Sequence, residues 1–210
     1  MRKIILVLLI SITNFWIWRI FVQSAGMAII LVLLSIFLVL RLKWLSLIFF
    51  ILLSIFLLKT SFDTNLLYVS PLENDKLENR HEYYAQSLGR LYRNRIGIYL
   101  HKNISPYVSR FEKNLAYNLD PNLYFFASHP RERLGIDEFN KFPLIALPFF
   151  LIGLGVLLSG RHYFLIGYFV LSIIVSGFIF PGYRLGPILI FPFMISILYL
   201  GLLKVINRFS

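Results

Sequence analysis

One polar stretch, residues 60–141, organises the rest of the chain, and it opens with TSFDTNLLYVSPLENDKLENRHEYY (residues 60–84). It holds all ten acidic residues of the protein and eleven of its 21 Lys and Arg residues. On both sides of this stretch the sequence is almost continuously apolar. The chain therefore divides into an apolar part at residues 1–59, a polar part at residues 60–141 and a second apolar part at residues 142–210.

The composition is that of a membrane protein. Of the 210 residues, 58% are hydrophobic and only 15% are charged, which lies outside the range of soluble domains. The polar stretch contributes only +1 of the net charge of +11 (11 basic minus 10 acidic residues), so most of the excess cations flank apolar runs. Cations in such positions anchor helix ends and set their orientation. We therefore expect a lipid bilayer as partner and no nucleic acid, because no basic stripe carries interleaved stacking residues.

Six apolar runs are candidate membrane spans, since a span needs about 17–25 mostly apolar residues. The fold class that this predicts is all-α, a multi-pass membrane protein with six transmembrane helices and a helical segment between helices three and four. The runs are Ile4–Val22, Ala25–Leu40, Trp44–Leu58, Phe142–Leu158, Tyr163–Phe180 and Gly186–Val205.

The distribution of cations predicts the topology. Seven Lys and Arg residues would flank the spans on one side and three on the other, which places the richer side in the cytoplasm. Both termini are then cytoplasmic and residues 60–141 are extracytoplasmic, in a cell-membrane protein. The seven are Arg2, Lys3, Arg41, Lys43, Arg161, Lys204 and Arg208, and the three are Arg19, Lys59 and Arg184.

The polar stretch is predicted to be helical. Ser70-Pro71-Leu72-Glu73 is typical of a helix start, with Ser as N-cap, Pro at the first helical position and Glu at the capping-box position. A second helix is predicted from Ser105-Pro106 to Leu119, with Val108, Phe111, Leu115 and Leu119 on one face. Asp120-Pro121 ends it, because a residue before Pro avoids the helical conformation. Both helices could lie on the bilayer, pack over the spans or pack against each other.

The candidate functional residues lie in two predicted outer loops. Ser128-His129-Pro130-Arg131-Glu132-Arg133 is the densest polar cluster, and Arg184 stands between the fifth and sixth spans. Guanidinium groups suit phosphate through paired hydrogen bonds, so His129, Arg131, Arg133 and Arg184 are predicted to bind the phosphate of a lipid. The alternative is that they are separate anchors at the membrane surface.

Other chemistry finds little support in the sequence. The chain has no Cys, which excludes thiolate zinc sites, and neither a metal nor a cofactor is predicted. The interiors of the spans carry no Asp, Glu or His, which argues against a proton-coupled carrier. No catalytic residue can be assigned.

Residues 91–204 resemble the C-terminal part of bacterial GT-C glycosyltransferases of the protein O-mannosyltransferase-like kind. The similar pieces are Asp120–Pro130 followed by Arg133, Leu147–Leu154, and Arg184–Gly201. The resemblance implies contact with a polyprenyl-phosphate-linked sugar outside the membrane. Those enzymes carry catalytic acids in their first outer loop, whereas the corresponding Gln23-Ser24-Ala25-Gly26 has none. The resemblance therefore implies the fold of an accessory half without the catalytic N-terminal half.

Two functions follow as expectations. The first is a GT-C-like membrane protein of cell-envelope glycosylation, which binds a polyprenyl-phosphate-linked sugar or acts as the accessory half of a glycosyltransferase beside a partner membrane subunit. Whether the chain is an enzyme stays open: if it is one, it is a membrane glycosyltransferase that uses a lipid-linked sugar donor and is inactive alone. The alternative is a non-enzymatic scaffold or assembly protein that holds a partner through its extracytoplasmic helices.

Overall fold

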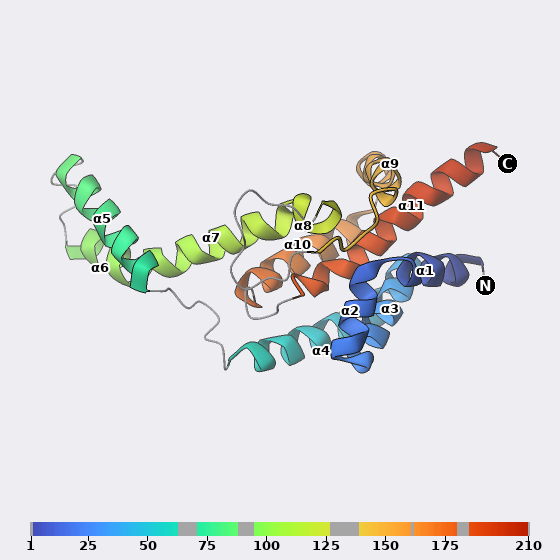
Figure 1. Cartoon of the computed structure of the whole chain (residues 1–210), viewed down its shortest axis with the longest axis horizontal. Coiled ribbons are helices and arrows are strands. Elements are labelled where there is room, and N and C mark those ends of the chain that lie inside the picture. The colour runs from blue at the N-terminus through green and yellow to red at the C-terminus, as the bar shows by residue number, and fades with distance from the viewer. Residues whose placement is uncertain are drawn as a thin grey trace.

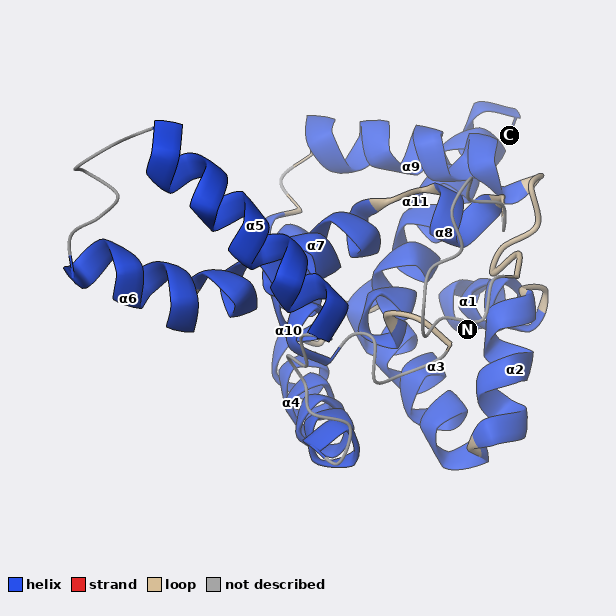
Figure 2. Ribbon diagram, turned by 60° about the vertical axis from the view of Figure 1, so that its left-hand side comes forward, coloured by secondary structure: helices blue, strands red, loops and turns tan. Residues whose placement is uncertain are grey.

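The computed structural model describes residues 2–62, 71–87, 95–126, 139–160, 162–179 and 185–209. Within these ranges all regular structure is helical and no strand occurs (Figures 1 and 2). The all-α class predicted from the sequence is confirmed.

The apolar runs form helices close to the predicted bounds. Ala25–Leu40, for example, was predicted as one helix, and α3 covers Ala25–Val39. The helices of the apolar parts are α1 (Arg2–Ile12), α2 (Phe15–Gln23), α3 (Ala25–Val39), α4 (Lys43–Phe62), α9 (Ala146–Ser159), α10 (Tyr163–Ile179), the 3-10 turn η2 (Ile188–Ile190) and α11 (Phe191–Phe209).

The predicted count of six membrane spans is not confirmed. In the part of the chain that the structure describes, one helix, Ile188–Arg208, is long and apolar enough to cross a membrane. The count rises to at most three if each of two bent helix pairs, α1 with α2 and α9 with α10, forms one span. The structure thus supports apolar helices able to enter a membrane.

The first apolar run, Ile4–Val22, is two helices rather than the single one predicted. α1 and α2 meet at an angle of 77°. Asn14 stabilises the break, because its side-chain oxygen accepts a hydrogen bond from the Ile17 amide (2.9 Å) and its Nδ2 donates to the Ile10 carbonyl (3.4 Å). A side chain that caps a new helix favours a fresh start over continuation. The sequence signal, Thr13-Asn14 inside an apolar run, was present but was read as part of one helix.

α11 is the centre of the molecule. Every residue from Leu185 to Tyr199 is buried, and α1, α3, α9 and α10 pack around this segment (Figure 1). α9 approaches most closely, because Gly153 lies against the Ile197 carbonyl and Gly201 lies against the Phe149 carbonyl. Small residues that let backbones approach in this way are typical of helix contacts in membranes.

The polar stretch forms α5 (Pro71–Ser87), α6 (Arg95–Asn103), α7 (Ser105–Leu119) and α8 (Asn122–Phe125). The predicted helix starts at Pro71 and Ser105 and the predicted end at Leu119 are confirmed. Of the three placements considered for the second helix, packing over the apolar helices is the one observed for α7, which lies along α10.

The face that α7 buries agrees with the prediction only in part. Phe111 and Leu115 of the predicted face lie against Gly177 of α10. Val108 and Leu119 are exposed, whereas Asn114 and Asn118 are fully buried. Asn114 Nδ2 donates to the Gly177 carbonyl of α10 (2.9 Å). This hydrogen bond holds α7 against α10, so a buried face inferred from apolar residues alone is incomplete.

Candidate anion-binding junction

The four predicted lipid-phosphate ligands, His129, Arg131, Arg133 and Arg184, lie outside the described residues. The structure does describe the chain on both sides of them: α8 and Phe126 precede the first loop, residues 139–142 follow it, and Leu185 follows Arg184. The geometry of these flanking segments shows where the two loops begin and end.

Lys141 is the centre of this region, which we call the Lys141 junction and define as residues 14–19, 123–126, 139–142 and 185–191. The Lys141 side chain is fully buried (0% exposed). Its Nζ donates to the Leu123 carbonyl (2.9 Å) and lies 5.6 Å from the Trp16 ring centroid and 4.7 Å from that of Phe139. Aromatic faces attract a cation through their negative quadrupole, so the amine has favourable contacts inside an apolar core.

Backbone hydrogen bonds fix Lys141 in place. The amides of Lys141 and Phe142 both donate to the Tyr124 carbonyl (3.0 and 2.9 Å), and the Lys141 carbonyl accepts from the Trp16 amide (3.2 Å). The Tyr124 hydroxyl donates to the Asn118 carbonyl at the end of α7 (2.6 Å). These bonds join the start of α2, the end of α7 and the two sides of the first predicted loop.

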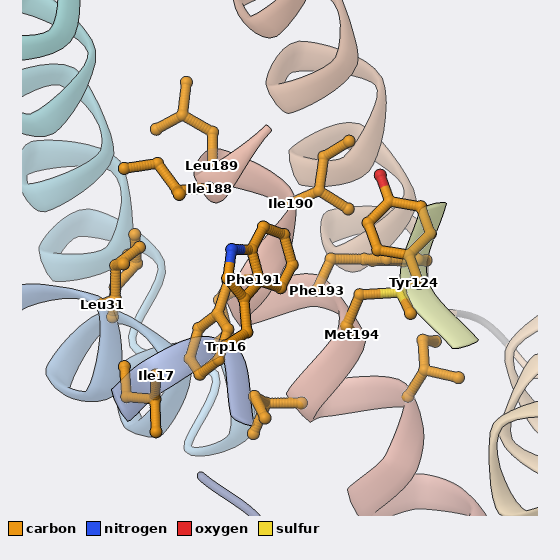
Figure 3. Close-up of a cluster of buried hydrophobic side chains, with 14 of the residues drawn as sticks. Trp16, Ile17, Leu31, Tyr124, Ile188, Leu189, Ile190, Phe191, Phe193 and Met194 are labelled. Atoms are coloured by element: carbon orange, nitrogen blue, oxygen red, sulfur yellow. The ribbon is translucent and has the colours of Figure 1, made fainter. Parts of the chain in front are cut away.

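Trp16 connects the same region to the second predicted loop. It is completely buried, its indole Nε1 donates to the Leu185 carbonyl (2.8 Å), and its ring contacts Tyr124, Phe142 and Phe191 with centroids 5.8–6.1 Å apart (Figure 3). A buried Trp usually finds an acceptor for its N–H. Trp16 is therefore a core residue, whereas Trp18 is half exposed (51%).

Gly186 gives the closest approach between the two loop-flanking segments. Its φ is +86°, and a Cβ at this position would lie 3.0 Å from Lys141 Cε. Both the backbone conformation and the available space therefore favour glycine. Lys141, which follows the loop of Arg131 and Arg133, thus packs directly on the segment that follows Arg184.

A second cation lies beside the junction. The Arg19 guanidinium lies 4.3 Å from the centroid of the Phe139 ring, which Lys141 also approaches. Arg19 and Lys141 thus share one aromatic ring directly after residue 138.

Sequence reasoning missed Lys141 as a site residue. The signal was a lone cation directly before an apolar run, which was counted only in the charge balance. Its burial depends on Trp16 and Gly186, which are far away in the sequence. The pattern of residues around Lys141 therefore could not predict that the side chain is buried.

Within the described residues no group of three or more His, Asp or Glu side chains is arranged to hold a metal ion. Comparison with protein-family models, with curated proteins and with solved structures finds no match to this chain. Fold and composition define the class as an all-helical protein with apolar helices able to cross a membrane.

Proposed function

We propose that this chain is an integral membrane protein of cell-envelope glycosylation that binds the phosphate of a polyprenyl-linked sugar at the Lys141 junction. The observation that supports the proposal is the packing of Lys141 against Gly186. This contact brings together the segments that flank Arg131 and Arg133 on one side and Arg184 on the other. Guanidinium groups gathered at one place can hold a phosphate by charge-assisted hydrogen bonds.

In this proposal the chain acts as the accessory half of a GT-C-like glycosyltransferase. The connection that corresponds to the acid-bearing loop of those enzymes is short: Ser24 ends α2 and its hydroxyl accepts from the Met27 amide (3.4 Å) to cap α3. General-base activation of an acceptor needs a positioned acid–base group. We therefore expect the purified chain to transfer no sugar from a polyprenyl-phosphate donor unless a partner subunit supplies that group.

The proposed topology has six spans, both termini in the cytoplasm and residues 60–141 outside. Two single-Cys variants, Asp75→Cys and Leu42→Cys, test it, since the chain has no cysteine of its own. In intact cells an impermeant thiol reagent should label position 75 and leave position 42 unlabelled. Labelling at position 42 with protection at position 75 would invert the topology.

Binding is tested with a short-chain polyprenyl phosphate and the purified chain in detergent. Arg184→Ala should weaken binding by about tenfold, the effect of losing one hydrogen bond between charged groups. Lys59→Ala is the matched control, because Lys59 is another cation predicted on the outer side but belongs to α4. If Arg184→Ala binds the polyprenyl phosphate with unchanged affinity and has an unchanged thermal midpoint, the proposal fails. The alternative that these cations are separate anchors at the membrane surface would then stand.

A scaffold function is the second candidate, and a specific feature favours it. α5 and α6 lie at the end of α7 that is remote from the apolar helices (Figure 1), and Tyr83, Ile96 and Tyr99 are exposed there (61–71%). Exposed large apolar side chains on neighbouring helices are candidates for contact with a partner protein. A photo-crosslinking residue at position 99 in living cells should capture a membrane protein under this hypothesis, whereas the same residue at position 22 in α2 should capture lipid.

A further inference from the structure

A second cluster of basic residues surrounds a pocket beside the middle of α11. The pocket has a volume of about 370 Å³ and lies where the end of α3, the start of α4, the start of α10 and the middle of α11 meet. Its polar lining consists of Lys3, Arg41, Lys43, His162, Tyr163, Ser196 and Tyr199. Its remaining lining is apolar, including Leu165 and Leu203.

No acidic residue lines this pocket in the described part of the chain. All ten acids of the protein fall between Asp63 and Glu138, far in sequence from every segment that forms the pocket. The three Lys and Arg side chains therefore create a positive potential that residues 1–62 and 139–210 cannot neutralise. Such basic pockets between apolar helices are suited to anionic headgroups.

Arg41 adopts an unusual backbone conformation at the edge of this pocket. Its φ is +60°, and it is the only non-glycine residue with positive φ in the described ranges. The Leu42 amide donates to the Phe37 carbonyl (2.9 Å) and the Arg41 amide donates to the Leu38 carbonyl (3.1 Å). This pattern is a Schellman motif, in which the residue at the Arg41 position is usually Gly because a Cβ is unfavourable there.

Because glycine would be less strained at this position, the presence of arginine indicates a functional role for the Arg41 side chain. The guanidinium of Arg41 donates to Nδ1 of His162 (3.3 Å), which joins the α3–α4 turn to the start of α10. Arg41 is exposed and lines the pocket. Backbone strain of this kind is found mostly where a ligand or a catalytic step needs the residue.

We propose that this pocket binds a phosphate group, with Arg41 as its principal ligand and Lys3 and Lys43 as supporting charges. The planar guanidinium offers paired donors to phosphate oxygens, and the apolar lining accommodates the first carbons attached to the phosphate. The phosphate can belong to a membrane lipid or to a soluble diphosphate. The site is distinct from the Lys141 junction, because Lys141 packs against Gly186, which precedes α11, and no residue of the junction lines the pocket.

The test uses the purified full chain in detergent with two probes: dioctanoyl phosphatidic acid for the lipid source and inorganic pyrophosphate for the soluble source. Dioctanoyl glycerol, which carries the same acyl chains without a phosphate, measures binding through acyl chains alone. The central variant is Arg41→Gly, which removes the ligand and relieves the strained backbone, so the thermal midpoint should not fall. Arg41→Lys keeps the charge without the planar fork. Lys204→Ala is the matched control, since Lys204 is an exposed cation on α11 that does not line the pocket.

We expect saturable binding of at least one phosphate probe, weakened about tenfold or more in Arg41→Gly, as the loss of hydrogen bonds between charged groups implies. Arg41→Lys should be intermediate and Lys204→Ala close to the native chain. Preference for phosphatidic acid would assign the site to a lipid, and preference for pyrophosphate to a soluble ligand. Equal losses in Arg41→Gly and Lys204→Ala, or no saturable binding of either probe to the native chain, would overturn the proposal.

Discussion

Two glycines on α9 should respond in opposite ways to the same substitution. A Cβ at Gly153 would meet the Ile197 carbonyl oxygen well inside the contact distance, whereas a Cβ at Gly155 would meet nothing within 4 Å. Alanine is favoured over glycine in a helix by about 1 kcal/mol. Gly155→Ala should therefore raise the free energy of unfolding. Gly153→Ala should gain the same helix-propensity term, but overlap of the new methyl group with α11 should outweigh it.

The size of the loss follows from the geometry. To restore a contact of 3.0 Å, α9 and α11 must separate by roughly 1 Å, and a close-packed interior cannot absorb this locally. Overpacking of this kind costs about 1–3 kcal/mol. We take the upper end of this range because the group that the new methyl would meet is a backbone carbonyl, which cannot rotate away as a side chain could. The net effect of Gly153→Ala is thus a loss of about 2 kcal/mol, and the two variants should differ by about 3 kcal/mol.

Thermal unfolding of the purified chain in detergent measures this difference, with intrinsic tryptophan fluorescence as the signal. For a chain of this length 1 kcal/mol corresponds to about 2–4 °C in Tm, so the two variants should be roughly 6–12 °C apart. Gly201→Ala should behave like Gly153→Ala, because its Cβ would meet the Phe149 carbonyl. Equal midpoints for Gly153→Ala and Gly155→Ala would refute the close approach of α9 and α11.

Three further substitutions test separate contacts. Lys141→Ala should lower stability by about 2–5 kcal/mol and shift Trp16 emission to the red, because it removes a fully buried side chain together with its hydrogen bond and ring contacts; an unshifted spectrum would contradict the junction geometry. Asn114→Ala should cost about 1–3 kcal/mol by leaving the Gly177 carbonyl without its donor, and limited proteolysis should then cleave within α7 faster than in the native chain. Tyr168→Phe should lower Tm by only about 2–4 °C, because it removes one hydrogen bond of ordinary strength and keeps the ring.

Helix positions were largely predictable because their signals are local. The apolar runs, Pro71 at one helix start and Asp120-Pro121 at a helix end all act within a few residues, and the structure places the helices accordingly. The break at Asn14 was missed because one polar residue in an apolar run is compatible both with a continuous helix and with a cap. In the structure Asn14 caps a new helix, because its side chain hydrogen-bonds both the Ile10 carbonyl and the Ile17 amide.

The site residues were less predictable because they depend on contacts between distant segments. Lys141 is separated from Trp16 by 125 positions (141 minus 16) and is buried against its ring. Arg41 looked like one of several cations beside a span, and only its backbone conformation distinguishes it. His129, Arg131, Arg133 and Arg184 stay predictions, since they lie outside the described residues.

The burial of α11 has a consequence for how the protein is made. The helix around which α1, α3, α9 and α10 pack follows all of them in the chain. During synthesis those four helices are made before their common partner has left the ribosome, so the faces that later contact α11, including Gly153 of α9, are still uncovered. Packing of the bundle must therefore wait for α11, and a ribosome stalled before residue 185 would leave a partly assembled chain as a substrate for quality-control proteases.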